Sequence, residues 1–235
     1  MVLTALGATI GLDAAQWVTG AVLGAAVTGL VVHAATRSGH QLAPADLVTF
    51  LRCMLGCVVA ALLVHGDDDR SVVRVAVAVA VVALVTDLVD GRVARRTGTT
   101  PFGGRFDGEA DAFLILVLAV HVASTGPTWV ILIGAIRYLF GAGELWLAWF
   151  RLRLPPRYWR KVAAAVQGVV LTAVAADVLP PLVEVAALVL ALGLLVESFG
   201  RDVLWLWWRR GRESVQPDAA VAGAPVPADL TVASG

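Results

Sequence analysis

Charged residues and cysteines are both scarce in this sequence of 235 residues. Only 15% of the residues are charged while 59% are hydrophobic, a balance that excludes an ordinary soluble globular domain. The two cysteines, Cys53 and Cys57, stand one turn apart in an apolar stretch with no histidine or second cysteine pair nearby, so core packing is favoured over a metal or redox role. The sequence also lacks a Walker loop and a G-x-S-x-G motif. Any chemistry must therefore come from polar residues in or beside apolar helices.

Long apolar runs rich in Ala, Leu and Val occupy most of the chain. A membrane-spanning helix needs about 20 mainly apolar residues, and seven segments qualify. Strands of a membrane barrel would instead alternate in hydrophobicity over ~10 residues. The sequence therefore predicts an all-α integral membrane protein, with spans at residues 14–36, 44–65, 72–91, 109–126, 128–150, 162–180 and 181–200.

The basic residues are distributed unequally between the two ends of these spans. Only Arg70 and Arg74 fall on one side of the membrane. Because positive residues remain on the cytoplasmic side, the N-terminus is predicted outside, in a cell membrane, with a retained first helix. The fourteen residues on the predicted cytoplasmic side are Arg37, Arg92, Arg95, Arg96, Arg105, Arg151, Arg153, Arg157, Arg160, Lys161, Arg201, Arg209, Arg210 and Arg212.

Four aspartates interrupt the apolar pattern near the predicted cytoplasmic side. Asp87 and Asp90 are three residues apart at the end of one predicted helix, while Asp107 and Asp111 are four apart at the start of the next. Neighbours at these spacings lie ~5 to 6 Å apart on one helix face. If the two helices are antiparallel neighbours joined by the loop TGTTPFGG, both pairs meet at one depth. Unit charges 4 Å apart repel by about 4 kcal/mol at an effective dielectric constant of 20, so this cluster needs a cation.

Oxygen ligands without histidine or cysteine favour Mg²⁺, Mn²⁺ or Ca²⁺ over zinc or copper. Mg²⁺ is commonly shared with substrate phosphates, so a phosphate-bearing substrate is implied. Small residues would let a bulky ligand approach the backbone, and Arg95 can pair with a phosphate. Alternatively, the aspartates only form ion pairs with nearby arginines, which would not require two acid pairs in register. The small residues are Gly91, Ala94, Gly103 and Gly104, and the arginines are Arg92, Arg95, Arg96 and Arg105.

The segment DLVDGRVAR, followed by GGRFDGEAD, resembles the signature of the CDP-alcohol phosphotransferase (CDP-alcohol phosphatidyltransferase) family. That signature runs D-x-x-D-G-x-x-A-R, then eight residues, then G-x-x-x-D-x-x-x-D. Here the spacer has seven residues, 96–102, so either Gly103 or Gly104 fills the glycine position. Upstream, PADLVTFLR is similar to the family's first helix, and downstream RKVAAAVQ is similar to the start of its fifth.

The resemblance implies a six-helix membrane core and a defined reaction. An alcohol attacks the β-phosphorus of a CDP-alcohol, which forms a phosphodiester and releases CMP. Asp87, Asp90, Asp107 and Asp111 would hold two divalent cations, Mg²⁺ or Mn²⁺, and Asp111 would also act as the general base. The CDP-alcohol would be bound by Thr49, Arg52, Gly91, Ala94, Arg95, Gly103 or Gly104, and Lys161. The expected parts of the chain are an additional N-terminal helix and loop in residues 1–40, the family core in residues 41–212, and a disordered cytoplasmic tail in residues 213–235.

The substrates are narrowed only in part by the sequence. CDP-diacylglycerol is the favoured donor, because a site at the end of membrane helices can take a lipid sideways. A phosphorylated polyol acceptor such as glycerol 3-phosphate or inositol phosphate would find cationic partners in a cluster of basic residues within and just beyond one span, namely Arg137, Arg151, Arg153, Arg157, Arg160 and Lys161. Alternatively, the basic residues only set orientation and bind headgroups, and another small alcohol is the acceptor. Family members that make phosphatidylglycerol phosphate commonly have Asp-Pro, whereas this chain has Asp107-Gly108 and an unusual additional acid, Glu109. This departure argues against assigning glycerol 3-phosphate as the acceptor.

Further partners and functions remain open from the sequence alone. Glu144 and Glu197 either line the pocket or pair with arginines such as Arg137 and Arg201. Membrane lipids are expected partners, a homodimer is left open, and no nucleic-acid partner is expected. The competing functions are an ion-coupled transporter and a non-catalytic membrane subunit. A transporter should carry polar residues through the depth of the bundle, often on internal repeats, whereas these acids gather at one end.

Overall fold

The chain is described here from a computed structural model. It describes the backbone of residues 4, 7, 11–39, 43–64, 69–97, 101–146 and 158–213. For residues 38, 88–97, 101–102, 144–146, 158 and 209–213 it describes only the course of the helix. Of the predicted C-terminal tail, residue 213 is the last residue of a helix and residues 214–235 lie outside the described residues.

Seven α-helices and one short 3-10 helix account for almost all of the described residues, which contain no strand. The prediction of an all-α protein is therefore confirmed, and each predicted span overlaps one α-helix. The helices are α2 (Ala14–Ser38), α3 (Pro44–Leu62), α4 (Arg70–Thr97), α5 (Pro101–Thr125), η1 (Thr128–Val130), α6 (Ile131–Trp146), α7 (Tyr158–Ala175) and α8 (Pro181–Glu213).

Three of the described helices are long and apolar enough to cross a membrane, which makes this an integral membrane protein. These candidate spans are Ala14–Arg37, Pro44–Leu62 and Pro181–Trp208, and Thr128–Gly143 is a shorter apolar helix. The full set of seven spans stays a prediction.

Local sequence explains where several helices begin and end. Pro44 occupies the first turn of α3, where a missing N–H costs no hydrogen bond, and Asp46 accepts a hydrogen bond from the backbone N–H of Ala43 at 2.8 Å. Helix α5 begins at Pro101, so the sequence-based assignment of PFGG to a loop was wrong. After α7, Asp177 adopts a positive φ of 54°, which turns the chain toward α8.

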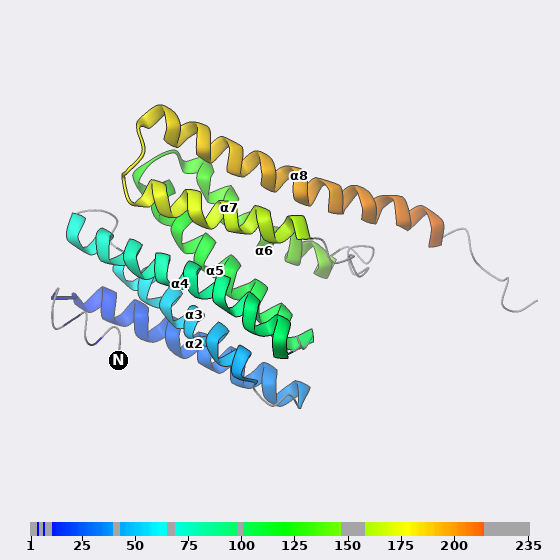
Figure 1. The fold of residues 1–235 in the computed structure, drawn as a ribbon, viewed down its shortest axis with the longest axis horizontal. Helices are drawn as coiled ribbons and strands as arrows, with labels where there is room; N and C mark the ends of the chain where they lie inside the picture. The colour runs from blue at the N-terminus through cyan, green and yellow to red at the C-terminus, as the bar shows by residue number, and fades with distance from the viewer. Residues whose placement is uncertain are drawn as a thin grey trace, which may run out of the picture.

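The helices lie side by side along one long axis, with α2 and α8 at opposite edges of the bundle (Figure 1). Helix α3 packs against α2, α4 and α5, while α5 also packs against α6 and α7. Helix α7 in turn contacts α4 and α8. Only 6% of the α2 span is buried, against 61% of the α3 span, so α2 is peripheral and α3 is central.

Small residues allow close approach between the helices that carry the aspartates and their neighbours. Ala76, Ala80 and Ala83 of α4 are fully buried at helical spacing in the core. On α6, a Cβ added at Gly134 would lie only 2.6 Å from the Cα of Leu116 on α5. This contact between backbones requires glycine, and it brings the following turn of α6 close to the start of α5.

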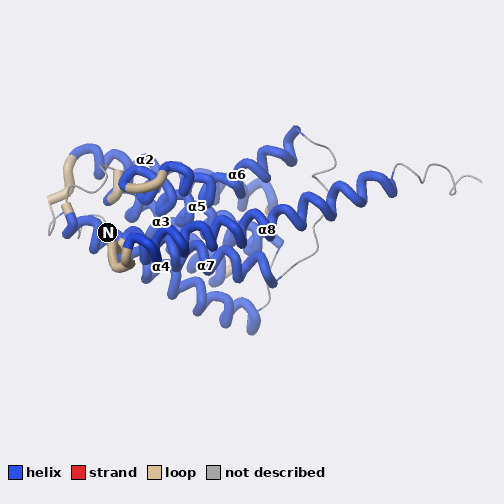
Figure 2. Tube along the Cα trace, turned by 90° about the horizontal axis from the view of Figure 1, so that it is seen from above, coloured by secondary structure: helices blue, strands red, loops and turns tan. Residues whose placement is uncertain are grey.

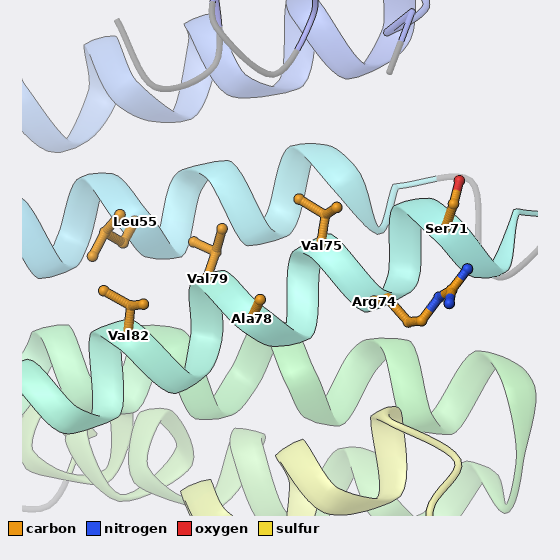
Figure 3. Close-up of a pocket in the computed structure, with 7 residues that line it drawn as sticks. All are labelled: Leu55, Ser71, Arg74, Val75, Ala78, Val79 and Val82. Carbon is orange, nitrogen blue, oxygen red and sulfur yellow. The ribbon is translucent and has the colours of Figure 1, made fainter. Parts of the chain in front are cut away.

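An open groove of about 520 Å³ runs along the N-terminal half of α4 (Figure 3). Its walls are apolar except for Ser71 and Arg74 at one end. Arg74 is thirteen residues from Asp87 on the same helix, which corresponds to about 20 Å at 1.5 Å per residue. At its other end, Val82 is five residues before Asp87, about 7.5 Å at 1.5 Å per residue, so the groove ends close to the acidic cluster although none of the described aspartates lines it. Its lining residues are Leu55, Ser71, Arg74, Val75, Ala78, Val79 and Val82.

Candidate active site

Three of the four predicted aspartates come together at one end of the bundle. Asp87 of α4 and Asp107 and Asp111 of α5 each offer a carboxylate oxygen, and these atoms lie within 4.8 Å of one another. All three residues are partly buried. The two helices are aligned by α3 and α7, each of which packs against both α4 and α5. We call these three residues the aspartate triad.

Arg52 of α3 lies at the centre of the aspartate triad. Its side chain is only 4% exposed, and its Nη1 lies 2.9 Å from an oxygen of Asp87 and 2.5 Å from an oxygen of Asp107. Its Nη2 donates to Asp111. One guanidinium thus joins carboxylates from two other helices.

The charges and donor atoms of the triad fit a divalent cation. Three carboxylates carry three negative charges if all are ionised, and Arg52 is their one ion-pair partner among the described side chains. A net charge of about −2 remains on a set of oxygen donors, and this is the ligand type that Mg²⁺ and Mn²⁺ prefer.

Arg52 was assigned by resemblance to binding the CDP-alcohol, and its observed contacts are with the aspartates. The arginines considered as partners from the sequence were Arg92, Arg95, Arg96 and Arg105 instead. A signal for Arg52 was available, because a charged residue inside an apolar span usually faces the bundle interior and pairs with an opposite charge.

A second ion pair lies beside the triad, between α5 and α6. Arg137 Nη2 donates to Glu109 Oε1 at 2.7 Å. The same nitrogen would lie 3.1 Å from a Cβ added at Gly108, so the guanidinium rests against a bare stretch of α5. The sequence analysis considered Glu144 as a partner for an arginine such as Arg137. In the structure Arg137 contacts Glu109, and the side chain of Glu144 lies outside the described residues.

One ion pair and one hydrogen bond also connect α7 and α8 at the same end of the bundle. Arg160 Nη2 donates to Oδ1 of the buried Asp202 at 3.0 Å, and Nε of the same guanidinium lies within ion-pair distance of Oδ2, at 2.8 Å. Glu197 pairs with Arg201 one turn further along α8, which is one of the two alternatives that the sequence left open, and it accepts a hydrogen bond from Trp159 Nε1 at 2.9 Å. These contacts hold the start of α7 against α8.

Comparison with known proteins identifies the family to which the chain belongs. The family model described as CDP-alcohol phosphatidyltransferase matches residues 42–197, about two thirds of the chain. The chain belongs to the CDP-alcohol phosphatidyltransferase family. It is therefore a transferase of phospholipid biosynthesis that uses a CDP-alcohol donor and an alcohol acceptor, and its acidic cluster is a candidate for the divalent cations that such enzymes use.

Two curated relatives support the family membership. Each is named "Probable phosphatidylglycerophosphate synthase", one from Mycobacterium tuberculosis strain CDC 1551 / Oshkosh and the other from strain ATCC 25618 / H37Rv. Each is 32% identical over 157 residues, which cover 65% of this chain and 75% of the relative. No solved structure matches the chain.

The other residues expected to bind the CDP-alcohol occupy varied positions in this phosphatidyltransferase. Thr49 is buried one turn before Arg52, and its hydroxyl donates to the carbonyl of Ala45 at 3.3 Å. Lys161 is exposed at the start of α7, close enough to Asp87 for an electrostatic interaction. Gly103 is partly buried, whereas Gly104 is exposed and has open space where a Cβ would stand.

Four further predicted site residues are on the last turns of α4. Asp90 follows Asp87 by three residues on this helix, so helical geometry places it on the same face. The side chain of Asp90 lies outside the described residues, and so do positions Gly91, Ala94 and Arg95 apart from the course of the helix. Their roles stay predictions.

Proposed function

We propose that this enzyme transfers a phosphatidyl group from CDP-diacylglycerol to an alcohol acceptor and releases CMP. The observation that carries the proposal is the aspartate triad, gathered around Arg52 at one end of a membrane bundle in a chain of this family. A lipid donor suits that position, because its acyl chains remain in the bilayer while its diphosphate reaches the helix ends.

In this proposal Asp87, Asp90, Asp107 and Asp111 hold two divalent cations, Mg²⁺ or Mn²⁺. Bound cations would neutralise charge on the donor's diphosphate and on the departing CMP. Arg52 holds the carboxylates in register, so the ligand set needs little rearrangement before the donor arrives. Lys161, on the α7 side of the triad, adds a positive charge near the diphosphate.

Asp111 is the proposed general base. Its carboxylate accepts the proton of the acceptor hydroxyl, and the resulting oxygen attacks the β-phosphorus. The bond from that phosphorus to the bridging oxygen breaks, and CMP leaves with the electron pair. A carboxylate can do this only within hydrogen-bonding reach of the hydroxyl, and the contact with Arg52 fixes where the Asp111 oxygens point.

The proposed membrane arrangement follows from the packing and from the distribution of charge. Helices α3 to α8, from Pro44 to Glu213, form the six-helix core, and α2 is an addition that packs against its outside. The N-terminus is outside and the triad faces the cytoplasm of the cell. The chain after α8, residues 214–235, is the proposed cytoplasmic tail.

Purified enzyme in detergent tests the proposal directly. CMP release from CDP-diacylglycerol should require Mg²⁺ or Mn²⁺ and one alcohol from a panel of glycerol 3-phosphate, inositol phosphate, glycerol, inositol and serine. The Asp107→Asn variant is the matched control, since it keeps the side-chain shape but removes a charged ligand. An enzyme that releases no CMP with any acceptor would overturn the proposal, and metal transport into sealed vesicles would support the transporter instead.

A further inference from the structure

The ion pair between Arg137 and Glu109 lies at an exposed position, where an ion pair adds little to the stability of the fold. Its two side chains are 42% and 59% exposed, and exposed ion pairs stabilise proteins only weakly. Both residues belong to segments predicted to cross the membrane, where charged side chains usually mark a functional site. The pair therefore needs an explanation beyond holding α5 against α6.

The position of Arg137 relative to the triad follows from helix geometry. Its guanidinium rests on Gly108, the residue directly after Asp107. Gly108 and Asp111 are three residues apart on α5, which places them as neighbours ~5 to 6 Å apart on the helix surface. Arg137 thus lies about one helical turn from the proposed base and to one side of the triad.

Two glycines make this position available to the arginine. Gly134 lets α6 approach α5 until their backbones nearly touch, and Arg137 follows one turn later. Gly108 then leaves room for the guanidinium, because a Cβ there would stand 3.1 Å from Nη2 and 3.7 Å from Cζ. Any larger residue at 108 would push the guanidinium away from α5.

We propose that Arg137, seated on Gly108 and oriented by Glu109, binds the phosphate of a phosphomonoester acceptor. This inference rests on the proposed phosphatidyl transfer. A guanidinium has five N–H donors in a planar fork that matches phosphate oxygens, and the contact with Glu109 uses one of them. A phosphate carries more charge than a single carboxylate, so it can replace or share the exposed Glu109 contact.

The geometry assigns this phosphate to the acceptor rather than to the CDP donor. The donor's diphosphate belongs at the triad, whereas Arg137 lies about 100° around α5 from Asp107 at 3.6 residues per turn. In a phosphorylated polyol a few bonds separate the phosphate from the attacking hydroxyl. Its phosphate can therefore rest on Arg137 while its hydroxyl reaches Asp111.

Steady-state kinetics with paired acceptors provides the test. Glycerol 3-phosphate is compared with glycerol, and inositol 1-phosphate with inositol, at saturating CDP-diacylglycerol and Mn²⁺. Unmodified enzyme should use only the phosphorylated member of a pair. Arg137→Gln should raise the KM for that acceptor by about 10- to 100-fold, the usual effect of losing hydrogen bonds between charged groups, with a smaller change in kcat and in the KM for the donor.

Three further variants separate phosphate binding from a structural role. Arg137→Lys should recover part of the affinity, because it restores the charge but not the fork. Gly108→Ala should raise the acceptor KM in the same direction by displacing the guanidinium. Arg201→Gln is the matched control, since it removes an exposed arginine that pairs with a glutamate at the same end of the bundle, and its KM values should be unchanged.

Each outcome decides between the two proposals. If Arg137→Gln leaves the acceptor KM within twofold, or raises the donor KM equally, the phosphate site at Arg137 is wrong. If unmodified enzyme uses only unphosphorylated alcohols, this inference fails and the phosphatidyl transfer stands. If no alcohol supports CMP release, the proposed function itself fails.

Discussion

Replacement of Arg52 by glutamine tests how the aspartate triad is held together. At the 4.8 Å limit that encloses the carboxylate oxygens, two unit charges repel by about 3.5 kcal/mol at an effective dielectric constant of ~20, or about 10 kcal/mol over three pairs. Arg52 contributes three attractions at shorter distances, which offset that repulsion. Glutamine keeps a similar length but removes the charge.

Removing one partner of a buried ion pair typically costs about 3 to 5 kcal/mol, which corresponds to a drop in Tm of roughly 6 to 20 °C for a chain of this size. We therefore expect Arg52→Gln to melt at a lower temperature than unmodified enzyme in EDTA. Added Mn²⁺ should recover much of this loss, because the cation takes over the role of the missing charge. Mn²⁺ should also bind more tightly to the variant, since one competing positive charge is gone.

A thermal-shift assay in detergent, with and without Mn²⁺, measures both effects, and Arg52→Lys is the control that keeps a positive charge. If Arg52→Gln has the same Tm as the unmodified enzyme in EDTA and the same dependence of Tm on Mn²⁺, Arg52 is not the charge that holds the triad together.

Three other changes test separate parts of the structure. Asp111→Asn should lower CMP release by about 10²- to 10⁴-fold while CDP affinity survives better than in Asp107→Asn, and near-normal turnover would refute the base assignment. Gly134→Ala should destabilise the protein by about 1 to 3 kcal/mol through overpacking against Leu116. Gly141→Ala is the control on the same helix, because it has open space around it and should not destabilise the protein. Equal Tm values for the two variants would contradict the close helix contact. Cysteines at Val178 and Gly39 should be labelled from opposite sides of the membrane, and labelling from the same side would reject the topology.

Hydropathy and helical spacing were sufficient to predict the helices and the shared face of Asp107 and Asp111, because both depend on residues close in sequence. The helix ends were harder to place. Helix α5 starts at Pro101 within a segment read as a loop, since proline and glycine indicate turns but a first helical turn also accepts proline. Helix α8 continues to Glu213, past the predicted span end at residue 200, because the hydrophobic pattern marks the membrane and not the helix.

The contacts of Arg52 could not be predicted in this way. It meets Asp107 and Asp111 from 55 and 59 residues away in sequence. Helical periodicity shows which face of a helix is apolar but not which neighbour packs on it. The seat of Arg137 on Gly108 was missed for the same reason, since it depends on how closely α6 approaches α5.

The length of α8 has a consequence for the depth of the reaction. Its 33 residues extend about 50 Å at 1.5 Å per residue, while the hydrocarbon layer is about 30 Å thick, so part of the helix must project beyond the lipid tails even when tilted. Figure 2 shows α8 extending past the other helices at one end. Trp207 and Trp208 are exposed near that end, where aromatic rings favour the headgroup layer, and Asp202 lies only about one and a half turns before them. Because Arg160 joins α7 to Asp202, the position of α8 in the membrane sets the depth at which α7 begins. The donor's diphosphate would then react close to the headgroup layer.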